Sequence, residues 1–377
     1  MRIYHNIWLF YAFWGTSFTF CALEAHLGEE DKVFGTVETA PGCDSVLKYL
    51  ETLKEKLGEE CEFICGYEAG CLGYSLYRQL TRQGVKCVIL APTTMMTTQG
   101  KRRKTDKRDA LVIAQCLAYG TYSPVYIPTE EDDAVKEYIR MRDDHRGALT
   151  KLKQQILSFC LRHDCKYPKS NWTGAHLDWL HKLELNGLYR EVLNEYLLTY
   201  AQLQEKIESL DKRIEELASE KRYKEKVAKL TCLLGVKTAT ALAVMVETGD
   251  FKRFKTGALY AAYLGLVPGE DSSGENIRRG GISKAGNSHV RRLMVEASQG
   301  ICRGRIGYKS KALKARQAGN SPEVIAYADK GNERMRRKYY KMIARGKLRN
   351  VAVTAIAREL ACFIWGIMTD NVSLMKH

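Results

Sequence analysis

The chain has 377 residues, an apolar fraction of 45%, and 59 Lys and Arg side chains against 44 Asp and Glu, which gives a formal net charge of +15. This length exceeds a single ordinary core and predicts two or three domains, while the apolar fraction excludes a disordered protein. Much of the excess charge lies between residues 303 and 349, where we count 15 basic and 3 acidic side chains. Such a segment is either a solvated face or a phosphate-binding surface, and Tyr339 and Tyr340 within it favour nucleic acid as the partner.

Cysteine usage and hydropathy bear on the compartment. Twelve cysteines are scattered singly through apolar runs, which predicts reduced thiols in a cytoplasmic protein. Cys160, His163 and Cys165 lie close together, but their spacing matches no usual zinc site. Residues 7–14 resemble a signal-peptide core, yet aromatic side chains fill it and no other segment approaches about 20 apolar residues. We therefore expect an irregular N-terminus leading into a first strand, and no membrane partner.

Residues 18–125 alternate short apolar runs with helical patterns, which predicts an α/β domain with a mixed sheet. In chain order the expected elements are a strand pair (18–23 and 33–37), a helix (44–57), a strand (63–67), a helix near 74–80, a strand (85–91) and a helix after Thr105.

Three carboxylates fall at the ends of these elements. Asp106 and Asp109 begin the last helix and share a face, because residues at i and i+3 are neighbours on a helix surface. Glu68 directly follows the strand at 63–67. Three acids placed this way can bind a hard cation through oxygen ligands, which predicts a Mg²⁺ site that acts on a phosphate substrate. The alternative is an exposed acid pair in a basic loop.

Beyond about residue 130 the strand pattern ends, and two sets of apolar residues recur every seven positions. The sets are Leu193, Tyr200, Ile207 and Ile214, and Tyr196, Leu203, Leu210 and Leu217. This repeat predicts a coiled-coil arm. Two interpretations remain open: a dimerising arm, or an intramolecular helical hairpin in which residues 130–160 supply the partner.

Two glycine-containing segments follow within residues 229–300. The segment 233–241 places a turn before an Ala-rich helix and resembles half of a helix-hairpin-helix, whose amides meet phosphate. The segment 278–287 combines glycines with basic side chains, so that backbone and charge can approach phosphate closely. Ser273 precedes it and, from the residues alone, is a turn serine. The expected phosphate contacts are Arg278, Arg279, Lys284, Arg291 and Arg292.

Together these segments resemble the DEDD insertion-sequence transposases of the IS-one-ten family, which are bridge-RNA-guided DNA recombinases. The matching pieces are Tyr67-Glu68-Ala69-Gly70, Lys104-Thr105-Asp106 through Asp109-Ala110, Leu264-Gly265-Leu266-Val267-Pro268, and Ser273-Gly274 followed by Arg279-Gly280-Gly281-Ile282-Ser283-Lys284-Ala285-Gly286-Asn287 and Arg291-Arg292. Their order and separation make the combination specific. The resemblance implies an α/β plus all-α fold: an RNase-H-like (RuvC-like) mixed-sheet domain at 1–160, a coiled-coil arm at 161–228 and a helical transposase domain at 229–377.

The resemblance also implies a chemistry. Glu68, Asp106 and Asp109 fall on the second, third and fourth members of the metal-binding DEDD set, and Ser273 falls on the nucleophilic serine. The implied reaction is attack of Ser273 Oγ on a DNA phosphodiester, assisted by Mg²⁺. In this family the serine and the carboxylates meet across subunits, which implies a homo-oligomer, either a dimer or a tetramer. The implied partners are transposon-end and target DNA and a non-coding guide RNA.

One member of the DEDD set is absent from this sequence. The first Asp falls on Phe13, or on Ala12 if the alignment shifts by one residue, and neither side chain binds metal. We therefore expect impaired turnover, and we interpret residues 1–13, which differ from the family pattern, as a truncated or frame-altered start. Two alternatives remain open: a metal-dependent junction nuclease that uses water in place of the serine, and a non-catalytic nucleic-acid-binding protein.

Overall fold

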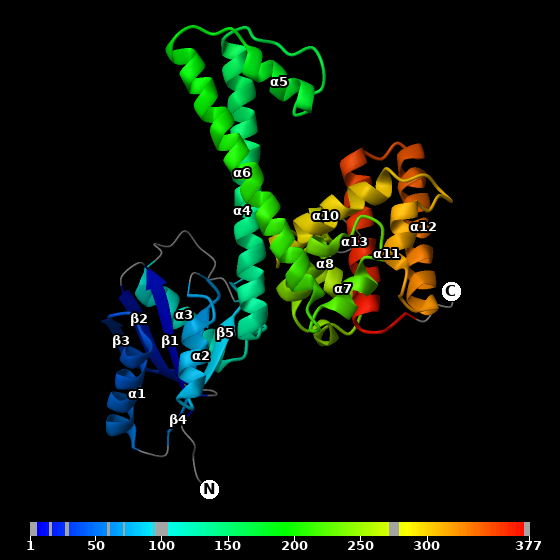
Figure 1. Ribbon diagram of the computed structural model, residues 1–377. Helices are drawn as coiled ribbons and strands as arrows, with labels where there is room; N and C mark the ends of the chain where they lie inside the picture. The colour runs from blue at the N-terminus through cyan, green and yellow to red at the C-terminus, as the bar shows by residue number, and fades with distance from the viewer. Residues whose placement is uncertain are drawn as a thin grey trace. The chain divides into compact units, whose positions relative to one another are not determined.

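The computed structural model describes residues 6–14, 17–26, 30–58, 61–70, 72–92, 95, 105–270 and 279–372, with backbone alone for 6–14, 270 and 279. Residue contacts divide the chain into two units, Met1–Ile127 and Pro128–His377. Each unit has buried hydrophobic side chains of its own, and Figure 1 shows the helices and strands that make up each unit. The division into three domains expected from the sequence stays a prediction.

A five-stranded mixed sheet forms the centre of the first unit. Its strands lie in the order β3-β2-β1-β4-β5. β1 pairs antiparallel with β2 and β2 antiparallel with β3, whereas β4 runs parallel to both β1 and β5. The predicted α/β character and mixed sheet are therefore confirmed. The strands are β1 (Asn6–Trp14), β2 (Ser17–Glu24), β3 (Lys32–Thr39), β4 (Glu62–Glu68) and β5 (Lys86–Leu90).

The expectation of an irregular N-terminus was wrong for residues 6–14, which form the central strand β1. Aromatic and β-branched residues favour strands, and a continuous apolar run is typical of a strand that is covered on both faces of the sheet. The same composition resembles a signal-peptide core. What distinguishes the two is the presence of pairing partners in β2 and β4, which a local pattern does not contain.

Three helices accompany this sheet. α1 (Cys43–Leu57) buries Val46, Leu50 and Leu53, which recur at helical spacing. α2 (Ser75–Arg82) follows β4, and α3 (Asp106–Ala118) packs against β1, β2 and β4.

The second unit begins with two long helices, α4 (Glu130–Arg162) and α6 (Leu188–Ser219), which pack against each other. Figure 1 shows them as an extended arm, with α5 (Gly174–Lys182) at the end away from α8. Leu152 and Ile156 of α4 share a buried cluster with Leu193 and Leu197 of α6. The partner of the heptad pattern is therefore α4 of the same chain, and a dimerising role of the arm stays a prediction.

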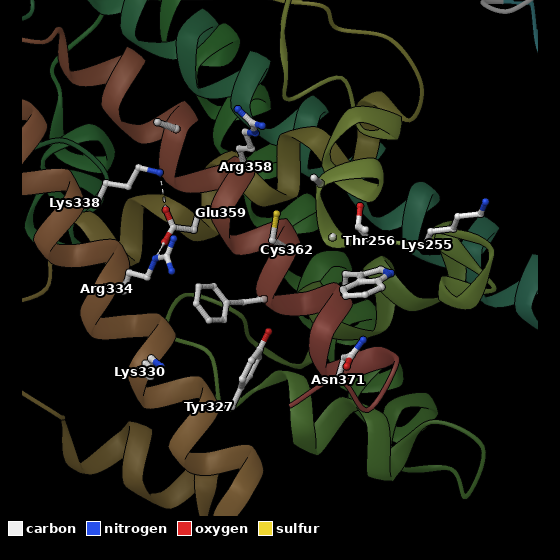
Figure 2. Close-up of a pocket in the computed structure, with 15 residues that line it drawn as sticks. Lys255, Thr256, Tyr327, Lys330, Arg334, Lys338, Arg358, Glu359, Cys362 and Asn371 are labelled. Atoms are coloured by element: carbon white, nitrogen blue, oxygen red, sulfur yellow. Dashed lines mark hydrogen bonds and ion pairs between the residues drawn. The ribbon is translucent and has the colours of Figure 1, made fainter. Parts of the chain in front are cut away.

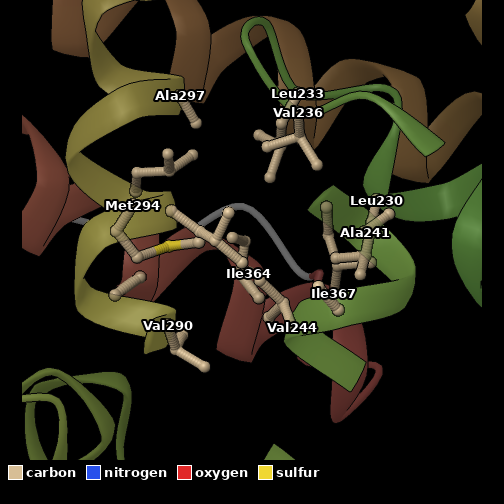
Figure 3. Packing of buried hydrophobic residues seen from close by; sticks show 14 of the residues in the cluster. Leu230, Leu233, Val236, Ala241, Val244, Val290, Met294, Ala297, Ile364 and Ile367 are labelled. Atoms are coloured by element: carbon tan, nitrogen blue, oxygen red, sulfur yellow. The ribbon is translucent and has the colours of Figure 1, made fainter. Parts of the chain in front are cut away.

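The rest of the second unit is helical apart from a two-stranded hairpin. Leu230, Val244, Met294 and Ile364 come from four different helices and meet in its core (Figure 3). The elements are α7 (Lys224–Leu230), α8 (Thr238–Thr248), the 3-10 helix η2 (Phe251–Arg253), α9 (Gly257–Tyr263), β6 (Pro268–Glu270), β7 (Arg279–Ile282), α10 (Ser288–Cys302), α11 (Lys311–Gln317), α12 (Pro322–Ala344) and α13 (Arg349–Met368).

Within the described part of the chain, α13 is the one helix whose length and composition would allow it to cross a membrane. Its most apolar 18-residue window is 61% buried inside the fold. That burial is expected of a core helix, because it packs against α9, α10 and α12.

Candidate functional site

The three predicted carboxylates lie at the ends of two elements of the first unit. Asp106 is the first residue of α3 and is exposed, and Asp109 is half-buried one turn later. Both face the positive end of the helix dipole, which favours negative charge in a first turn. Glu68 is the exposed last residue of β4.

The path of α3 over the sheet fixes where the two aspartates lie. Near its C-terminal end, Leu117 sits over Gly66 of β4, where an added Cβ would lie 2.5 Å from Leu117 Cδ1. Gly66 pairs with Phe10, which in turn pairs with Cys21, so the three form one row across the sheet. At the other end of the helix, Thr105, Lys107 and Arg108 line a hollow together with Cys21, Val33 and Thr36 of β2 and β3. The helix therefore crosses the strands, with its N-terminus over β2 and β3.

This path keeps Glu68 apart from the aspartates. At 1.5 Å per residue, Asp109 lies roughly 12 Å along the helix axis from Leu117. Glu68 lies only two residues beyond Gly66 on β4. Among the residues that the structure describes, no three His, Cys, Asp or Glu side chains gather closely enough to bind a metal ion. The carboxylate oxygens suit a hard cation, but the structure brings together the pair Asp106 and Asp109, not all three.

The register of β1 bears on the missing first aspartate. The pairing of Phe10 with Gly66, continued by two residues along both strands, places Ala12 beside Glu68. Residues paired across parallel strands occupy the same face of a sheet. Of the two positions left open by the sequence, Ala12 is the one that this backbone register places opposite Glu68, and Phe13 follows one residue later.

In the second unit, the sequence segments 264–268 and 283–287 pack backbone against backbone. Gly265 and Gly286 both have a φ of 65°. A Cβ added to Gly286 would lie 1.9 Å from the Tyr263 carbonyl oxygen, and one added to Gly265 would lie 2.4 Å from that of Ala285. Arg291 ties the two segments together, because its Nη1 donates to the carbonyls of Leu264 (2.9 Å) and Ala285 (2.8 Å). Glycine is required here for close approach within the protein.

These segments support the β6–β7 hairpin. Ser273 and Arg278 lie between its strands, outside the described residues, and for Arg279 the backbone alone is described. Lys284 is exposed, with a φ of 56°. Arg292 forms ion pairs with Asp143 of α4 and with Glu296. Both Arg291 and Arg292 therefore have partners within the fold, and their predicted contact with phosphate stays a prediction.

Sequence reasoning missed a polar network beneath this region. Glu247 of α8, whose side chain is 2% exposed, accepts hydrogen bonds from Arg140 Nε at 2.7 Å and Asn287 Nδ2 at 2.8 Å. The Asn287 Oδ1 atom also caps α10 by accepting from the Val290 amide. No local motif marks this network, because its members come from α4, α8 and α10.

Electrostatics in the network follow from burial and pairing. Burial raises the pKa of Glu247, but the hydrogen bonds from Arg140 and Asn287 outweigh it, and the net pKa is below the ordinary value. Burial also raises the pKa of Asp143, but the hydrogen bond and the positive charge of Arg292 lower it by more, so that the net pKa is below the ordinary value. Burial lowers the pKa of His289 by more than the nearby Glu247 and Asp143 raise it. The network therefore favours two carboxylates and a neutral imidazole.

Comparisons with known proteins place this architecture in a family. A DEDD model described as "Transposase" matches residues 15–163, and a model described as "Transposase IS116/IS110/IS902 family" matches residues 227–315. The y4qE protein of Sinorhizobium fredii, whose assignment as a transposase is provisional, is 36% identical over 306 residues, which are 81% of this chain and 75% of that protein. The transposase for insertion sequence element IS1533 of Leptospira borgpetersenii is 32% identical over 301 residues, which are 78% of this chain and 85% of that protein.

Fold and matches together define an insertion-sequence transposase with an N-terminal DEDD domain and a C-terminal helical domain. Within that class the chain belongs to the IS116/IS110/IS902 family, which is the IS-one-ten family that its motifs resemble. Membership implies DNA as a partner, and DEDD transposases typically use a divalent metal ion.

Proposed function

We propose that this transposase exchanges DNA strands through a serine nucleophile, with a guide RNA selecting the DNA. The first unit would be an RNase-H-like domain, an assignment supported by the strand order β3-β2-β1-β4-β5 with parallel pairing of β1, β4 and β5. Glu68, at the end of β4 beside β1, occupies the edge where the carboxyl ends of parallel strands meet. The reaction would take place in the cytoplasm, on nucleoid DNA.

The proposed chemical step is a transesterification. Ser273 Oγ attacks a DNA phosphorus and loses its proton, an Oγ–P bond forms, and the P–O bond to the leaving sugar oxygen breaks as that oxygen gains a proton. Mg²⁺ held by Asp106 and Asp109, which share the first turn of α3, would supply positive charge to the phosphoryl oxygens. Glu68 lies apart from this pair in the structure, so it would have to approach the pair when metal and DNA bind. Lys284 and the neighbouring arginines Arg278, Arg279, Arg291 and Arg292 would orient the phosphate backbone.

The proposed assembly is a homo-oligomer in which the serine of one subunit meets the carboxylates of another. The arm formed by α4 and α6 supports this, because it exposes large apolar side chains near its end: Leu161 is 65% exposed, Leu188 71% and Leu198 53%. Exposed apolar groups of this size favour association. We also propose that the arm is a domain of its own, which follows the DEDD domain and precedes the helical domain in the chain.

The β1 register is the observation that most directly supports the proposal of a DEDD site with one ligand missing. It puts position 12 beside Glu68, where the family resemblance predicts the first carboxylate. Ala12 stands there, so we propose that the chain turns over slowly. The test is strand exchange on paired donor and target DNA with Mg²⁺ and the non-coding RNA of the element. We expect Ala12→Asp to raise the rate by roughly a hundredfold or more, because a cation ligand contributes several kcal/mol.

Parallel assays of Phe13→Asp and Ser273→Ala complete the design, each examined for a covalent protein–DNA adduct. Phe13→Asp should stay as slow as wild type, because its position is one residue beyond the one opposite Glu68. Ser273→Ala should form no adduct. Cleavage retained in Ser273→Ala would instead indicate a junction nuclease that uses water, and DNA binding with no cleavage by any variant would indicate a non-catalytic binding protein.

A further inference from the structure

A cavity of about 590 Å³ lies within the second unit, between the start of α9 and the helices α12 and α13 (Figure 2). Its volume is in the range of ligand-binding pockets. Among the described residues that the proposed strand exchange uses, none lines it. The cavity therefore has no role in the proposed strand exchange as described above.

Basic side chains dominate the rim of the cavity. Lys255, Lys330, Arg334, Lys338 and Arg358 line it, against the single carboxylate of Glu359. The Glu359 side chain is 8% exposed and lies 2.6 Å from both Arg334 Nε and Lys338 Nζ, as Figure 2 shows for Lys338. Among the residues that the structure describes, Lys255, Lys330 and Arg358 have no ion-pair partner. The five basic side chains and the one carboxylate give the rim a net charge of +4. Such a rim attracts an anion.

Aromatic rings form the other part of the lining. The Tyr327 and Phe363 rings pack edge to face, with centroids 5.2 Å apart. Trp365 is fixed by a hydrogen bond from its Nε1 to the Phe254 carbonyl oxygen at 3.0 Å. Phe363 and Trp365 are both only half-buried, so part of each ring is open to the cavity.

Two glycines allow the helices to hold these rings. A Cβ added at Gly331 of α12 would lie 2.8 Å from the Phe363 ring, and one added at Gly366 of α13 would lie 2.1 Å from the Tyr327 hydroxyl. Each helix therefore has a glycine where the other presents an aromatic side chain. This close approach places the aromatic lining directly beside the cationic rim.

We propose that this cavity binds a short unpaired stretch of a single-stranded nucleic acid, with bases against Phe363 and Trp365 and successive backbone phosphates on Lys330 and Arg358. Aromatic stacking combined with cations that follow the backbone is the chemistry of single-strand recognition. A free inorganic anion would leave the aromatic lining without a contact. A base inside a duplex would first have to leave its stack, at a cost of a few kcal/mol.

The inference deepens the proposed function by adding a site for single strands, and rests on it only in taking nucleic acid as the partner. The test measures the binding of fluorescein-labelled 12-nucleotide single strands, one RNA and one DNA of the same sequence, and of the matching DNA duplex, to the full chain. We expect Lys330→Gln combined with Arg358→Gln to weaken single-strand binding by about tenfold. Both side chains are exposed, so their replacement should leave folding unchanged.

A matched control removes the same charge elsewhere in the unit. Lys311 and Lys314 are exposed on α11 and do not line the cavity, so Lys311→Gln combined with Lys314→Gln should weaken binding less than about twofold. Equal losses in the two double variants would overturn the proposal, because they would indicate a general charge effect. Tighter binding of the duplex than of either single strand would overturn it as well. The tighter of the two single strands identifies the natural ligand as RNA or DNA.

Photocrosslinking locates the base independently of charge. A strand carrying 5-bromouracil should crosslink to the α13 peptide that contains Phe363 and Trp365, and Trp365→Leu should reduce the yield. Crosslinks confined to other peptides would contradict the proposal. This crosslink is measured separately from strand exchange. A strand that crosslinks to this peptide while no Ser273 adduct forms would refute the proposed strand exchange alone. A Ser273 adduct that forms without this crosslink would refute the proposed nucleotide site alone.

Discussion

At the scale of single residues, Gly286 illustrates how a sequence motif can serve the fold. Its φ of 65° and the 1.9 Å that would separate an added Cβ from the Tyr263 carbonyl leave no room for a side chain. We expect Gly286→Ala to lower the free energy of unfolding by about 3 kcal/mol or more, because left-handed strain and the clash with backbone add. Urea unfolding followed by circular dichroism measures the change.

Gly281 supplies the control for this substitution. It belongs to the same motif, and an added Cβ would meet nothing within 4 Å. Gly281→Ala should therefore change the free energy of unfolding by less than about 1 kcal/mol. If the two variants unfold at the same urea concentration, the packing argument for Gly286 is wrong.

Residue spacing predicted the local part of the candidate site and no more. Asp106 and Asp109 share the first turn of α3 because the i, i+3 relation is a property of the helix itself. Where Glu68 lies relative to them depends on the angle at which α3 crosses the sheet, which the contact between Gly66 and Leu117 helps to set. Arg291 likewise looks like a phosphate ligand in sequence, but two distant carbonyls accept its hydrogen bonds.

At the scale of elements, the heptad pattern of α6 predicted which face is buried but left the partner open. Apolar periodicity defines a stripe, and either a second chain or another helix of the same chain can cover it. The structure places α4 there, so that Leu193, Ile207, Leu210 and Ile214 are buried within one chain. The sequence offered residues 130–160 as one of two candidate partners, and the stripe on α6 does not by itself distinguish them.

The α4–α6 hairpin gives a prediction about stability. Ile156 of α4 is fully buried among the apolar side chains of the arm. Ile156→Ala should lower the free energy of unfolding by about 2–5 kcal/mol, because it removes buried methyl groups and leaves a cavity. Thermal or urea unfolding measures this loss. Leu198→Ala on α6 is the control: its side chain is 53% exposed, and a loss equal to that of Ile156→Ala would contradict this packing.

At the scale of the whole molecule, length alone predicted more than one domain, and the separate hydrophobic clusters of the two units agree with it. The structural division falls at residues 127 and 128, just before Thr129 caps α4 by accepting a hydrogen bond from the Asp132 amide. The boundary expected from the sequence is residue 160, although the strand pattern ends near residue 130 and two of the seven prolines, Pro124 and Pro128, flank the division. A cap of one helix is a weaker sequence signal than a linker.

Charge within the second unit leads to a prediction about pH. The folded pKa of His289 is below its ordinary value of about 6.5, because burial disfavours the imidazolium. Unfolded chains therefore bind a proton there that the folded chain does not, so the stabilisation is complete above about pH 6.5 and is lost as pH falls through the folded pKa. Glu247 and Asp143 also have lowered pKa values, but they lose their contribution only below about pH 4.

The urea concentration at the midpoint of unfolding should therefore decrease as the pH is lowered from 7 to 5, before Glu247 and Asp143 are protonated. His289→Gln should flatten this part of the curve, because the amide cannot take up the proton, while the fall below about pH 4 should remain. His181→Gln removes an exposed histidine of the arm and serves as the control variant over the same pH range. A wild-type midpoint that stays constant from pH 7 to pH 5 would show that the unfolded and folded chains bind the same number of protons in this range, and that Asp143 and Glu247 compensate for the burial of His289.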